Sequence, residues 1–318
     1  MPQMLDIFND DAFSLSSLTA TINEMEYKPG RLGALGLFNE TGINTTTAVV
    51  ESVNGVLRLL PSSERGAPAT QAVGDKRKVR SFVIPHIPHD STVLAAEVQN
   101  VRQFGSEDAL QGVQTVINQR LGMMNANHEV TLEFLRMGAL KGEILDGDGN
   151  SILYNLFEEF GVTQQTHDFK FGTTTTDTRA QAVKARRLVD AAMGAQPYAT
   201  LRAFCGADFF DGLVNHKSTK EAYQRWQDGE ALRNDARGSF RFADINWEEY
   251  RGSVGGNDFI PSNEAYLYPE DADIFKTWFA PADFVETVNT IGLPRYAKQK
   301  VMDFEKGVII HTQSNPLP

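Results

Sequence analysis

Residues 106–141 keep one helical period for longer than any other part of the chain, and this run most constrains the fold. Its apolar positions and one histidine recur at spacings of three and four, which places them on one face of a helix. These positions are Leu110, Val113, Ile117, Leu121, Met124, His128, Leu132, Leu135 and Ala139. Ser106 is suited to cap the start of the helix and Gly142 to end it. At ~1.5 Å per residue the helix is about 50 Å long, so we predict a spine that packs against something extended.

Composition places the chain among globular proteins with a sizeable core, since 41% of its 318 residues are hydrophobic and 22% are charged. The single cysteine, Cys205, excludes an intrachain disulfide framework and fits a reducing cytoplasm. No run of about 18 apolar residues and no basic-then-apolar N-terminus occurs, so we expect neither a membrane span nor a signal peptide. The net charge of -11 argues against a dedicated nucleic-acid binder.

The N-terminal region has little core of its own. Residues 14–25 predict a short helix, because Leu15, Leu18 and Ile22 recur at helical spacing. Residues 31–42 contain too many glycines for a stable helix. We therefore expect this arm to be ordered by contact with another surface.

Two apolar segments predict a long β-hairpin. The first begins at Thr45 and is rich in Val, Thr and Leu, and the second covers residues 79–87 and is interrupted by Pro85. An isolated two-stranded hairpin is marginally stable in water, so we expect a partner surface to complete this one. Four cations lie near its predicted tip, namely Lys76, Arg77, Lys78 and Arg80.

The second half of the chain alternates short helices and strands. Apolar pairs flank an Asp/Gly/Asn turn at residues 146–150, which predicts a hairpin. Ser218 is a suitable cap for the second of two short helices expected between residues 207 and 226. The remaining predicted elements are a helix at residues 180–193 and strands at residues 201–205, 239–249, 265–268 and 308–310.

The sequence His86-x-x-His89-Asp90 contains ligand types that suit zinc or iron. In an extended segment, however, residues i and i+3 point to opposite faces, and two prolines restrict the backbone here. A kinked strand end is the simpler interpretation. A metal-dependent enzyme that uses these residues is kept as an alternative from another class, although we expect no cofactor.

Asp146, Asp148 and Asn150 imitate the start of a calcium-binding loop. Ser151 stands where such a loop has Gly, and Phe157 where it has a bidentate Glu. A hairpin turn is therefore the simpler interpretation.

No other segment suggests catalysis. No nucleophile elbow, phosphate-binding loop or dinucleotide-binding fingerprint follows a predicted strand. Cys205 has no activating motif around it, so we interpret it as a small buried residue, and His128 as a hydrogen-bonded structural histidine. Five aromatic residues at helical spacings are interpreted as core: Phe204, Phe209, Phe210, Tyr223 and Trp226.

Several segments resemble the major capsid proteins of tailed phages of the lambda gpE type, which have the HK97 capsid fold. In the N-terminal half these are RLGALGLF at residues 31–38, IPHIPHD at residues 84–90, and AEVQNVRQFG at residues 96–105, which leads into the predicted spine helix. DGDGNSILYNLFEEFG follows that helix, and FIPSNEAYLYP and the closing HTQSNPLP are similar to later family segments. The resemblance covers nearly the whole chain.

The resemblance implies an α+β fold in four parts. These are an N-terminal arm (1–44), an extended loop formed by the hairpin (45–92), a peripheral domain with the spine helix (93–177 and 289–318) and an axial domain (178–288). The lack of a long helical N-terminal extension implies a separate scaffolding protein, and the end at Pro318 leaves a C-terminal truncation open. We expect assembly contacts from the cations at the hairpin tip and from Arg31, Leu32, Leu35 and Phe38 of the arm.

The function expected from the resemblance is not enzymatic. Such a protein self-assembles into hexamers and pentamers of an icosahedral phage head, or its prophage-encoded equivalent, which encloses double-stranded DNA without sequence-specific binding. Its partners are further copies of itself, a scaffolding protein and a portal, with a decoration protein left open and no membrane involved. It resides in the virion after assembly in the host bacterial cytoplasm. An encapsulin-like compartment, which holds cargo enzymes, is the alternative of the same fold.

Overall fold

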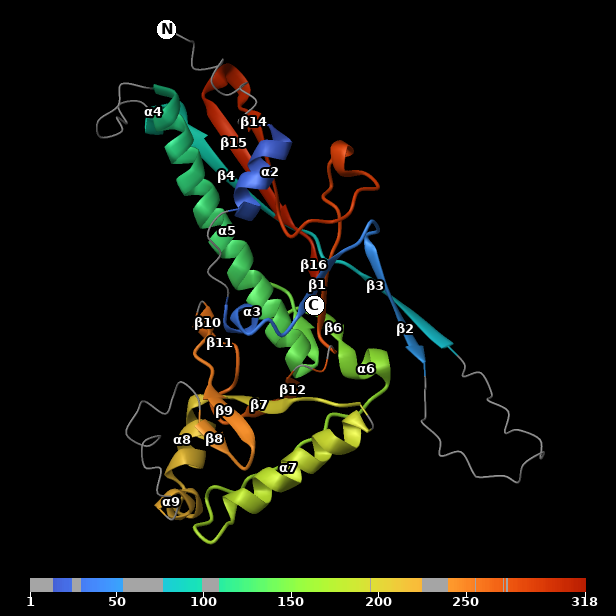
Figure 1. Cartoon of the computed structure of the whole chain (residues 1–318). Helices are drawn as coiled ribbons and strands as arrows, with labels where there is room; N and C mark the ends of the chain where they lie inside the picture. The colour runs from blue at the N-terminus through green and yellow to red at the C-terminus, as the bar shows by residue number, and fades with distance from the viewer. Residues whose placement is uncertain are drawn as a thin grey trace, which may run out of the picture. The chain divides into compact units, whose positions relative to one another are not determined.

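The computed structural model describes residues 14–24, 30–53, 77–98, 109–194, 196–224, 240–254, 256–270, 272 and 274–318 (Figure 1). The chain divides into two compact units. The first unit consists of Met1–Pro29, Glu40–Val130 and Lys276–Pro318, and the second of Gly30–Asn39 and Thr131–Phe275. Each unit is therefore built from segments far apart in the sequence. The division into four parts stays a prediction.

Helix α5 (Ala109–Lys141) confirms the predicted spine, with 33 residues in one helix. The predicted face is buried at Ile117, Leu121, Met124, His128, Leu132 and Leu135. The predicted cap Ser106 and the side chains of Leu110 and Val113 lie outside the described residues. Residues 109–130 of α5 belong to the first unit and residues 131–141 to the second. No described helix, α5 included, combines the length and apolar character needed to cross a membrane.

The first unit has a three-stranded antiparallel sheet in the order β14-β15-β4. Its strands are β4 (Ile87–Leu94), β14 (Tyr296–Val301) and β15 (Gly307–Ser314), and α2 (Leu15–Glu24) confirms the predicted N-terminal helix. Residues of α2, α5 and the sheet share one apolar core: Leu18, Ile22, Val93, Ile117, Leu121, Met124, Ala297 and Ile310. The part of the predicted face from Ile117 to Met124 thus packs against a sheet that joins β4 to two strands near the end of the chain.

Strands β2 (Thr47–Val53) and β3 (Arg77–Val83) pair in antiparallel fashion and confirm the hairpin. The prediction of one strand over residues 79–87 is wrong, because β3 ends at Val83 and Ile87 begins β4, which pairs with β15. Pro85 has no N–H for a strand ladder and restricts the residue before it. The chain therefore leaves the hairpin at this point.

A second three-stranded sheet of the first unit was not predicted. Its order is β1-β13-β16. The strands are β1 (Asn39–Gly42), β13 (Lys276–Phe279) and β16 (Pro316–Leu317). Each is short, and the pairing joins three distant parts of the chain, so no local pattern reveals it. Smaller elements of this unit are α4 (Ala95–Val98), η2 (Val285–Thr287) and η3 (Asp303–Glu305).

The second unit has a four-stranded sheet in the order β12-β7-β9-β8, in which only β7 and β9 are parallel. Its strands are β7 (Thr200–Cys205), β8 (Phe240–Phe242), β9 (Ile245–Glu249) and β12 (Ala265–Glu270). The single strand predicted at residues 239–249 is wrong, because Ala243 and Asp244 turn the chain with φ of 52° and 64°. Two residues with positive φ join hairpin strands without splaying them.

The predicted helices of the second unit are confirmed as α7 (Thr178–Met193), α8 (Ala207–Asn215) and α9 (Lys217–Gln224). Ser218 is not the cap of α9, which begins one residue earlier. Instead, Nδ1 of His216 accepts a hydrogen bond from the backbone N–H of Ser218 at 3.3 Å. The smaller elements are the predicted hairpin of β5 (Glu143–Leu145) and β6 (Ile152–Asn155), with α6 (Leu156–Phe160), β10 (Ser253–Val254) and β11 (Asn257–Asp258).

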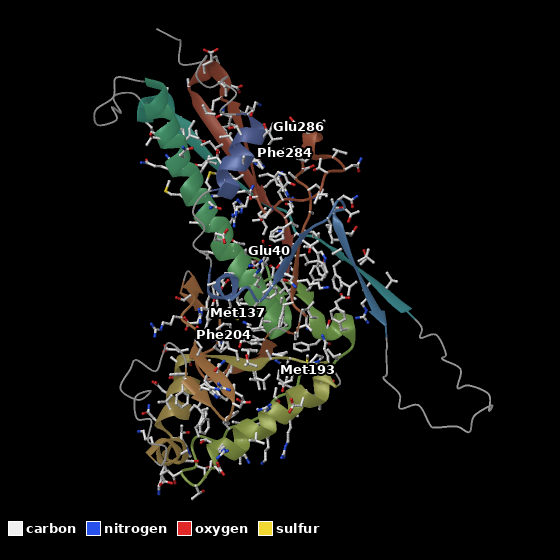
Figure 2. The ribbon with its side chains drawn as sticks, in the orientation of Figure 1. Glu40, Met137, Met193, Phe204, Phe284 and Glu286 are labelled. Atoms are coloured by element: carbon white, nitrogen blue, oxygen red, sulfur yellow. The ribbon has the colours of Figure 1, made fainter. Side chains whose placement is uncertain are left out.

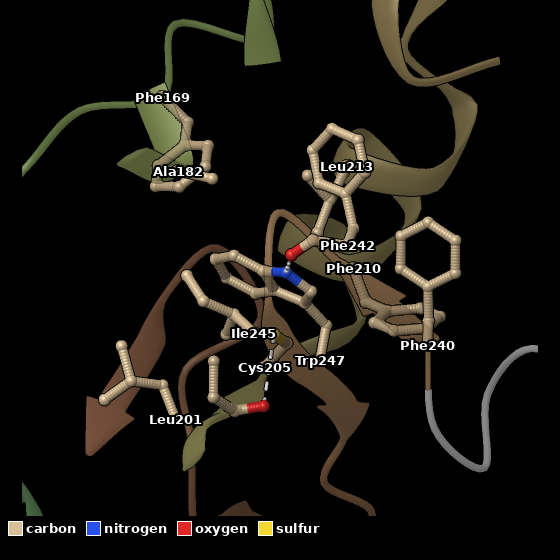
Figure 3. Packing of buried hydrophobic residues seen from close by; sticks show 11 residues of the cluster. Phe169, Ala182, Leu201, Cys205, Phe210, Leu213, Phe240, Phe242, Ile245 and Trp247 are labelled. Atoms are coloured by element: carbon tan, nitrogen blue, oxygen red, sulfur yellow. Dashed lines mark hydrogen bonds between the residues drawn. The ribbon is translucent and has the colours of Figure 1, made fainter. Parts of the chain in front are cut away.

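Aromatic side chains fill the core of the second unit around Trp247, whose Nε1 donates a hydrogen bond to the carbonyl of Phe242 at 3.0 Å (Figure 3). Cys205 is fully buried in this cluster, as predicted, and burial raises the pKa of its thiol. The predicted aromatic group is divided, because Phe210 lies in this cluster and Phe204 in a second one. Phe209 packs against the first cluster, whereas the side chain of Tyr223 and residue Trp226 lie outside the described residues.

Candidate assembly surfaces

The outer face of the β2–β3 hairpin carries three exposed valines. Val49, Val79 and Val83 are 59%, 60% and 62% exposed. Val49 lies opposite Ser81, and the two valines of β3 stand two residues to either side of Ser81 on the same face. The three side chains therefore form one patch, which is a candidate contact with another protein surface.

The inner face of the same hairpin is buried within the first unit. Ala48 and Phe82, which lie opposite each other, are 2% and 5% exposed. Among the described residues, one face of this two-stranded ribbon is therefore buried and the valines of the other face are exposed.

The predicted basic tip is described only in part. Arg77 and Lys78 are the first residues of β3 and lie opposite Val53 and Ser52. Lys76 lies outside the described residues, and so do the side chains of Arg77 and Lys78. Arg80 is half-buried within the hairpin. Contacts of these cations with a neighbouring copy stay a prediction.

The arm contains one helical turn, α3 (Arg31–Ala34), although its glycines argued against a helix. Glu133 explains the turn, because its buried carboxylate accepts the backbone N–H of Leu32 at 2.7 Å and of Gly33 at 3.4 Å. These donors have no partner inside a helix of their own. The hydroxyl of Tyr250 donates to the same carboxylate at 2.9 Å. A contact distant in sequence thus overrides the local propensity.

The other arm residues predicted to make assembly contacts are engaged within the second unit. Arg31 donates two hydrogen bonds to Glu248, at 2.5 Å and 2.9 Å, and this interaction raises the pKa of Arg31. Leu32 and Phe38 are buried in an apolar cluster, against which Leu35 also packs. Contact of these four side chains with a neighbouring subunit stays a prediction.

The three residues of the H-x-x-H-D sequence do not converge. Each side chain has its own hydrogen-bonding partner from another element. The pairs are His86 with Asn315, His89 with Asn127 and Asp90 with His311. Within the described ranges, no group of three or more His, Cys, Asp or Glu side chains could hold a metal ion.

His128 is a buried structural histidine of α5. The hydroxyl of Thr312 donates to the carbonyl of His89 at 3.1 Å, so Nε2–H of His128 is the donor in its 3.0 Å bond to that hydroxyl. Burial lowers the pKa of His128 to about 4, and the nearby charges of His89, Arg295 and His311 act in the same direction. The imidazole is therefore neutral in the folded chain near neutral pH.

This pKa predicts a loss of stability in acid. Unfolded His128 binds a proton near pH 6.5, whereas the folded residue binds one near pH 4. Between these values the unfolded state holds more protons, so the free energy of unfolding falls as the pH falls, by about 3 kcal/mol in total. Denaturant titrations from pH 7 to pH 4 should show this slope, and His128→Gln should reduce it. An unchanged slope in the variant would assign the acid sensitivity to other groups.

The segment that imitates a calcium loop is a hairpin turn, as interpreted. The carboxylate of Asp148 accepts the backbone N–H groups of Asn150 and Ser151, both at 2.8 Å, and the hydroxyl of Ser151 at 2.6 Å. These bonds lower the pKa of Asp148, with the hydroxyl making the largest contribution. They close the turn between β5 and β6.

An exposed apolar loop between β13 and β14 was not predicted from the sequence. Val285, Val288 and Ile291 are 90%, 65% and 69% exposed. The sequence signal for this loop was the recurrence of apolar residues every three positions in a segment with no helix caps. This loop is the second candidate surface.

Two curated proteins similar to this chain are major capsid proteins of phages. The chain is 27% identical over 307 residues to the major capsid protein of Pseudomonas phage KPP10, which covers 88% of this chain and 86% of that protein. It is 24% identical over 353 residues to the major capsid protein of Salmonella phage Felix O1, which covers 99% and 95%.

A crystal structure described as a candidate capsid protein of a prophage of E. coli CFT073 has a TM-score of 0.56 to this chain. The match covers 96% of this chain and 95% of the other at 14% identity, so it bears on the fold alone. The expected HK97-type α+β capsid fold is confirmed. The family described as phage major capsid protein E matches residues 14–318, and the chain therefore belongs to the phage major capsid protein E family.

Proposed function

We propose that this major capsid protein assembles, without catalysing a reaction, into the hexamers and pentamers of an icosahedral phage head that encloses double-stranded DNA. The observation that carries this proposal is the β2–β3 hairpin, whose inner face is buried within the chain and whose outer valine patch is exposed. A repeating neighbour covers such a patch in every copy. Burial of the valine patch in each subunit of a closed shell contributes a favourable hydrophobic free energy of assembly, which the free chain does not gain.

The net charge of the chain supports a shell that encloses DNA rather than a protein that binds DNA tightly. A net charge of -11 repels phosphate at long range and leaves packaged DNA free to move during packaging and ejection. A separate scaffolding protein and a portal belong to this proposal, and a decoration protein is left open. Assembly in the host bacterial cytoplasm is part of it as well.

An encapsulin-like compartment is the alternative, and membership of a phage major capsid family does not favour it. The contents of the particles distinguish the two. Particles purified after co-expression with the phage's own scaffolding and packaging proteins should contain double-stranded DNA that resists external nuclease. Particles that hold a folded enzyme and no DNA would favour the compartment.

The basic tip predicts a salt-sensitive assembly step. We expect Lys76, Arg77 and Lys78 to contact acidic surface on a neighbouring copy, where each exposed pair contributes about 0.2 to 1 kcal/mol. Replacing all three by Ser should raise the protein concentration needed for assembly at low salt. It should also make assembly less sensitive to salt concentration, because the charge–charge interactions that salt screens are absent from the variant. Light scattering across a salt series measures both effects.

The DNA content of completed particles is the control for this variant. Contacts between subunits predict an unchanged content. Normal assembly at every salt concentration, together with less packaged DNA, would show that the tip faces the interior.

A further inference from the structure

The turn between β5 and β6 contains two consecutive Asp-Gly steps, Asp146-Gly147 and Asp148-Gly149. Helix α5 ends shortly after Met137, which is labelled in Figure 2, and the hairpin follows directly. In an Asp-Gly step the glycine nitrogen can attack the aspartate carboxyl group, because glycine has no Cβ atom to obstruct the approach. Both steps contain the same two residues, so the structure around each decides whether this reaction occurs.

At the first step the reacting groups lie side by side on an exposed part of the turn. The backbone N–H of Gly147 donates to Oδ1 of Asp146 at 2.7 Å, and among the described residues it makes no other hydrogen bond. A Cβ atom at Gly147 would meet no other atom within 4 Å, so the space around the nitrogen is open. Bond formation here therefore requires no donor from another residue to leave the Asp146 carboxylate.

At the second step the same groups are held by hydrogen bonds to other residues. The Asp148 carboxylate accepts the N–H groups of Asn150 and Ser151 and the hydroxyl of Ser151. The N–H of Gly149 donates to the carbonyl of Asp146 at 2.9 Å. These bonds to the carboxylate lower the pKa of Asp148, the Ser151 hydroxyl most strongly. The carboxylate therefore stays ionised, whereas the reaction needs the protonated acid, which releases one oxygen as water.

From this contrast we propose that Asp146 is a site of spontaneous covalent modification, at which the folded chain converts to isoaspartate while Asp148 stays largely unchanged. The nitrogen of Gly147 bonds to Cγ of the protonated Asp146 carboxyl group, and the hydroxyl of that group leaves as water with the proton of the nitrogen. Water then adds to the main-chain carbonyl carbon of the resulting succinimide ring and breaks its bond to nitrogen. The main chain then runs through the side chain of residue 146, and no oxidant, reductant or cofactor takes part.

An isoaspartate at this position lengthens the main chain of the turn by one carbon atom. The N–H of Asp146 donates to the carbonyl of Ser151 at 2.7 Å, directly beyond the paired residues Leu145 and Ile152. The added atom changes the spacing between these groups, so we expect the closing end of the hairpin to open. The reaction takes place within one chain, so its outcome is independent of the proposed function.

A time course on the full chain in warm neutral buffer tests the proposal. Digestion followed by electron-transfer dissociation mass spectrometry distinguishes isoaspartate at residue 146 from isoaspartate at residue 148. In the folded chain we expect isoaspartate to form at least about tenfold faster at Asp146, because ring closure at Asp148 must first break several hydrogen bonds. In urea the two rates should become similar, because those bonds are absent. The peptide map also separates Asn54-Gly55 and Asp228-Gly229, which lie outside the described residues.

Two variants move the two positions independently. Gly147→Ala fits the turn, because Gly147 does not have a positive φ and the added methyl group meets no neighbour. It should slow the reaction at Asp146 about tenfold, because the methyl group obstructs the nitrogen. Ser151→Ala removes the hydroxyl bond to Asp148, so it should speed the reaction at Asp148 and leave the rate at Asp146 unchanged.

Three results would overturn the proposal. The first is an equal rate at both positions in the folded chain, and the second is a faster rate at Asp148. The third is a folded chain without isoaspartate at Asp146 after a time in which the chain in urea has formed it. Each result would mean that the hydrogen bonds of the turn do not select the position of the reaction.

Discussion

Replacing Leu121 with Asp should leave most of the protein insoluble. Leu121 is fully buried in the core that joins α5 to α2 and the β14-β15-β4 sheet. A carboxylate at this position has no cation in the apolar cluster around it, and burying such a charge costs several kcal/mol. That loss is comparable with the whole stability of an ordinary domain. The soluble fraction after expression and the thermal unfolding of any remaining protein measure the effect.

Asn118→Asp is the matched control for this prediction. It adds the same charge to the same helix at an exposed position. We expect its solubility and unfolding temperature to stay close to those of the parent chain. If Leu121→Asp were soluble and assembled normally, the assignment of the buried face of α5 would be wrong.

Removing the carboxylate of Glu133 should destabilise the second unit and release the arm. Leu32 N–H and the hydroxyl of Tyr250 both donate to this buried group. Burial raises the pKa of Tyr250, so its hydroxyl keeps its proton and needs an acceptor. Each unsatisfied buried donor costs about 1 to 3 kcal/mol, so Glu133→Ala should lower the free energy of unfolding by about 2 to 5 kcal/mol.

Two measurements test the effect of Glu133→Ala on stability and on the arm. Denaturant unfolding, monitored by tryptophan fluorescence, should show the lost stability, and limited proteolysis should cut near residues 30–39 sooner than in the parent. Glu143→Ala removes a carboxylate of the same charge that makes an exposed bond to Asn155 at 3.3 Å. It should change stability by no more than about 0.5 kcal/mol. Equal effects of the two variants would mean that Glu133 does not hold the arm.

The elements predicted from the sequence are those with a local period. The face of α5 follows from spacings of three and four, and the two hairpin strands follow from runs of Val and Thr. The break at Pro85 was visible in the sequence. Its consequence, the pairing of β4 with β15, was not, because these strands are more than 200 positions apart. The turn at Ala243 was missed because alanine is not a residue that favours positive φ.

The buried polar groups were the least predictable part of the structure. Glu133 lies on α5 beside the apolar stripe, and its partners come from the arm and from Tyr250. Glu129 of the same helix pairs with Arg295, which is even more distant in sequence. A charged residue next to an apolar stripe normally faces solvent. Only the folded chain shows which of these carboxylates have buried partners.

Electron cryomicroscopy of particles formed by the full chain, co-expressed with its scaffolding protein, tests whether this chain builds a capsid. We expect closed icosahedral shells built from rings of five and six copies, with the outer face of each β2–β3 hairpin covered by a neighbouring subunit. A chain that remains monomeric at every concentration, or shells in which the valine patch is solvent-exposed, would contradict it.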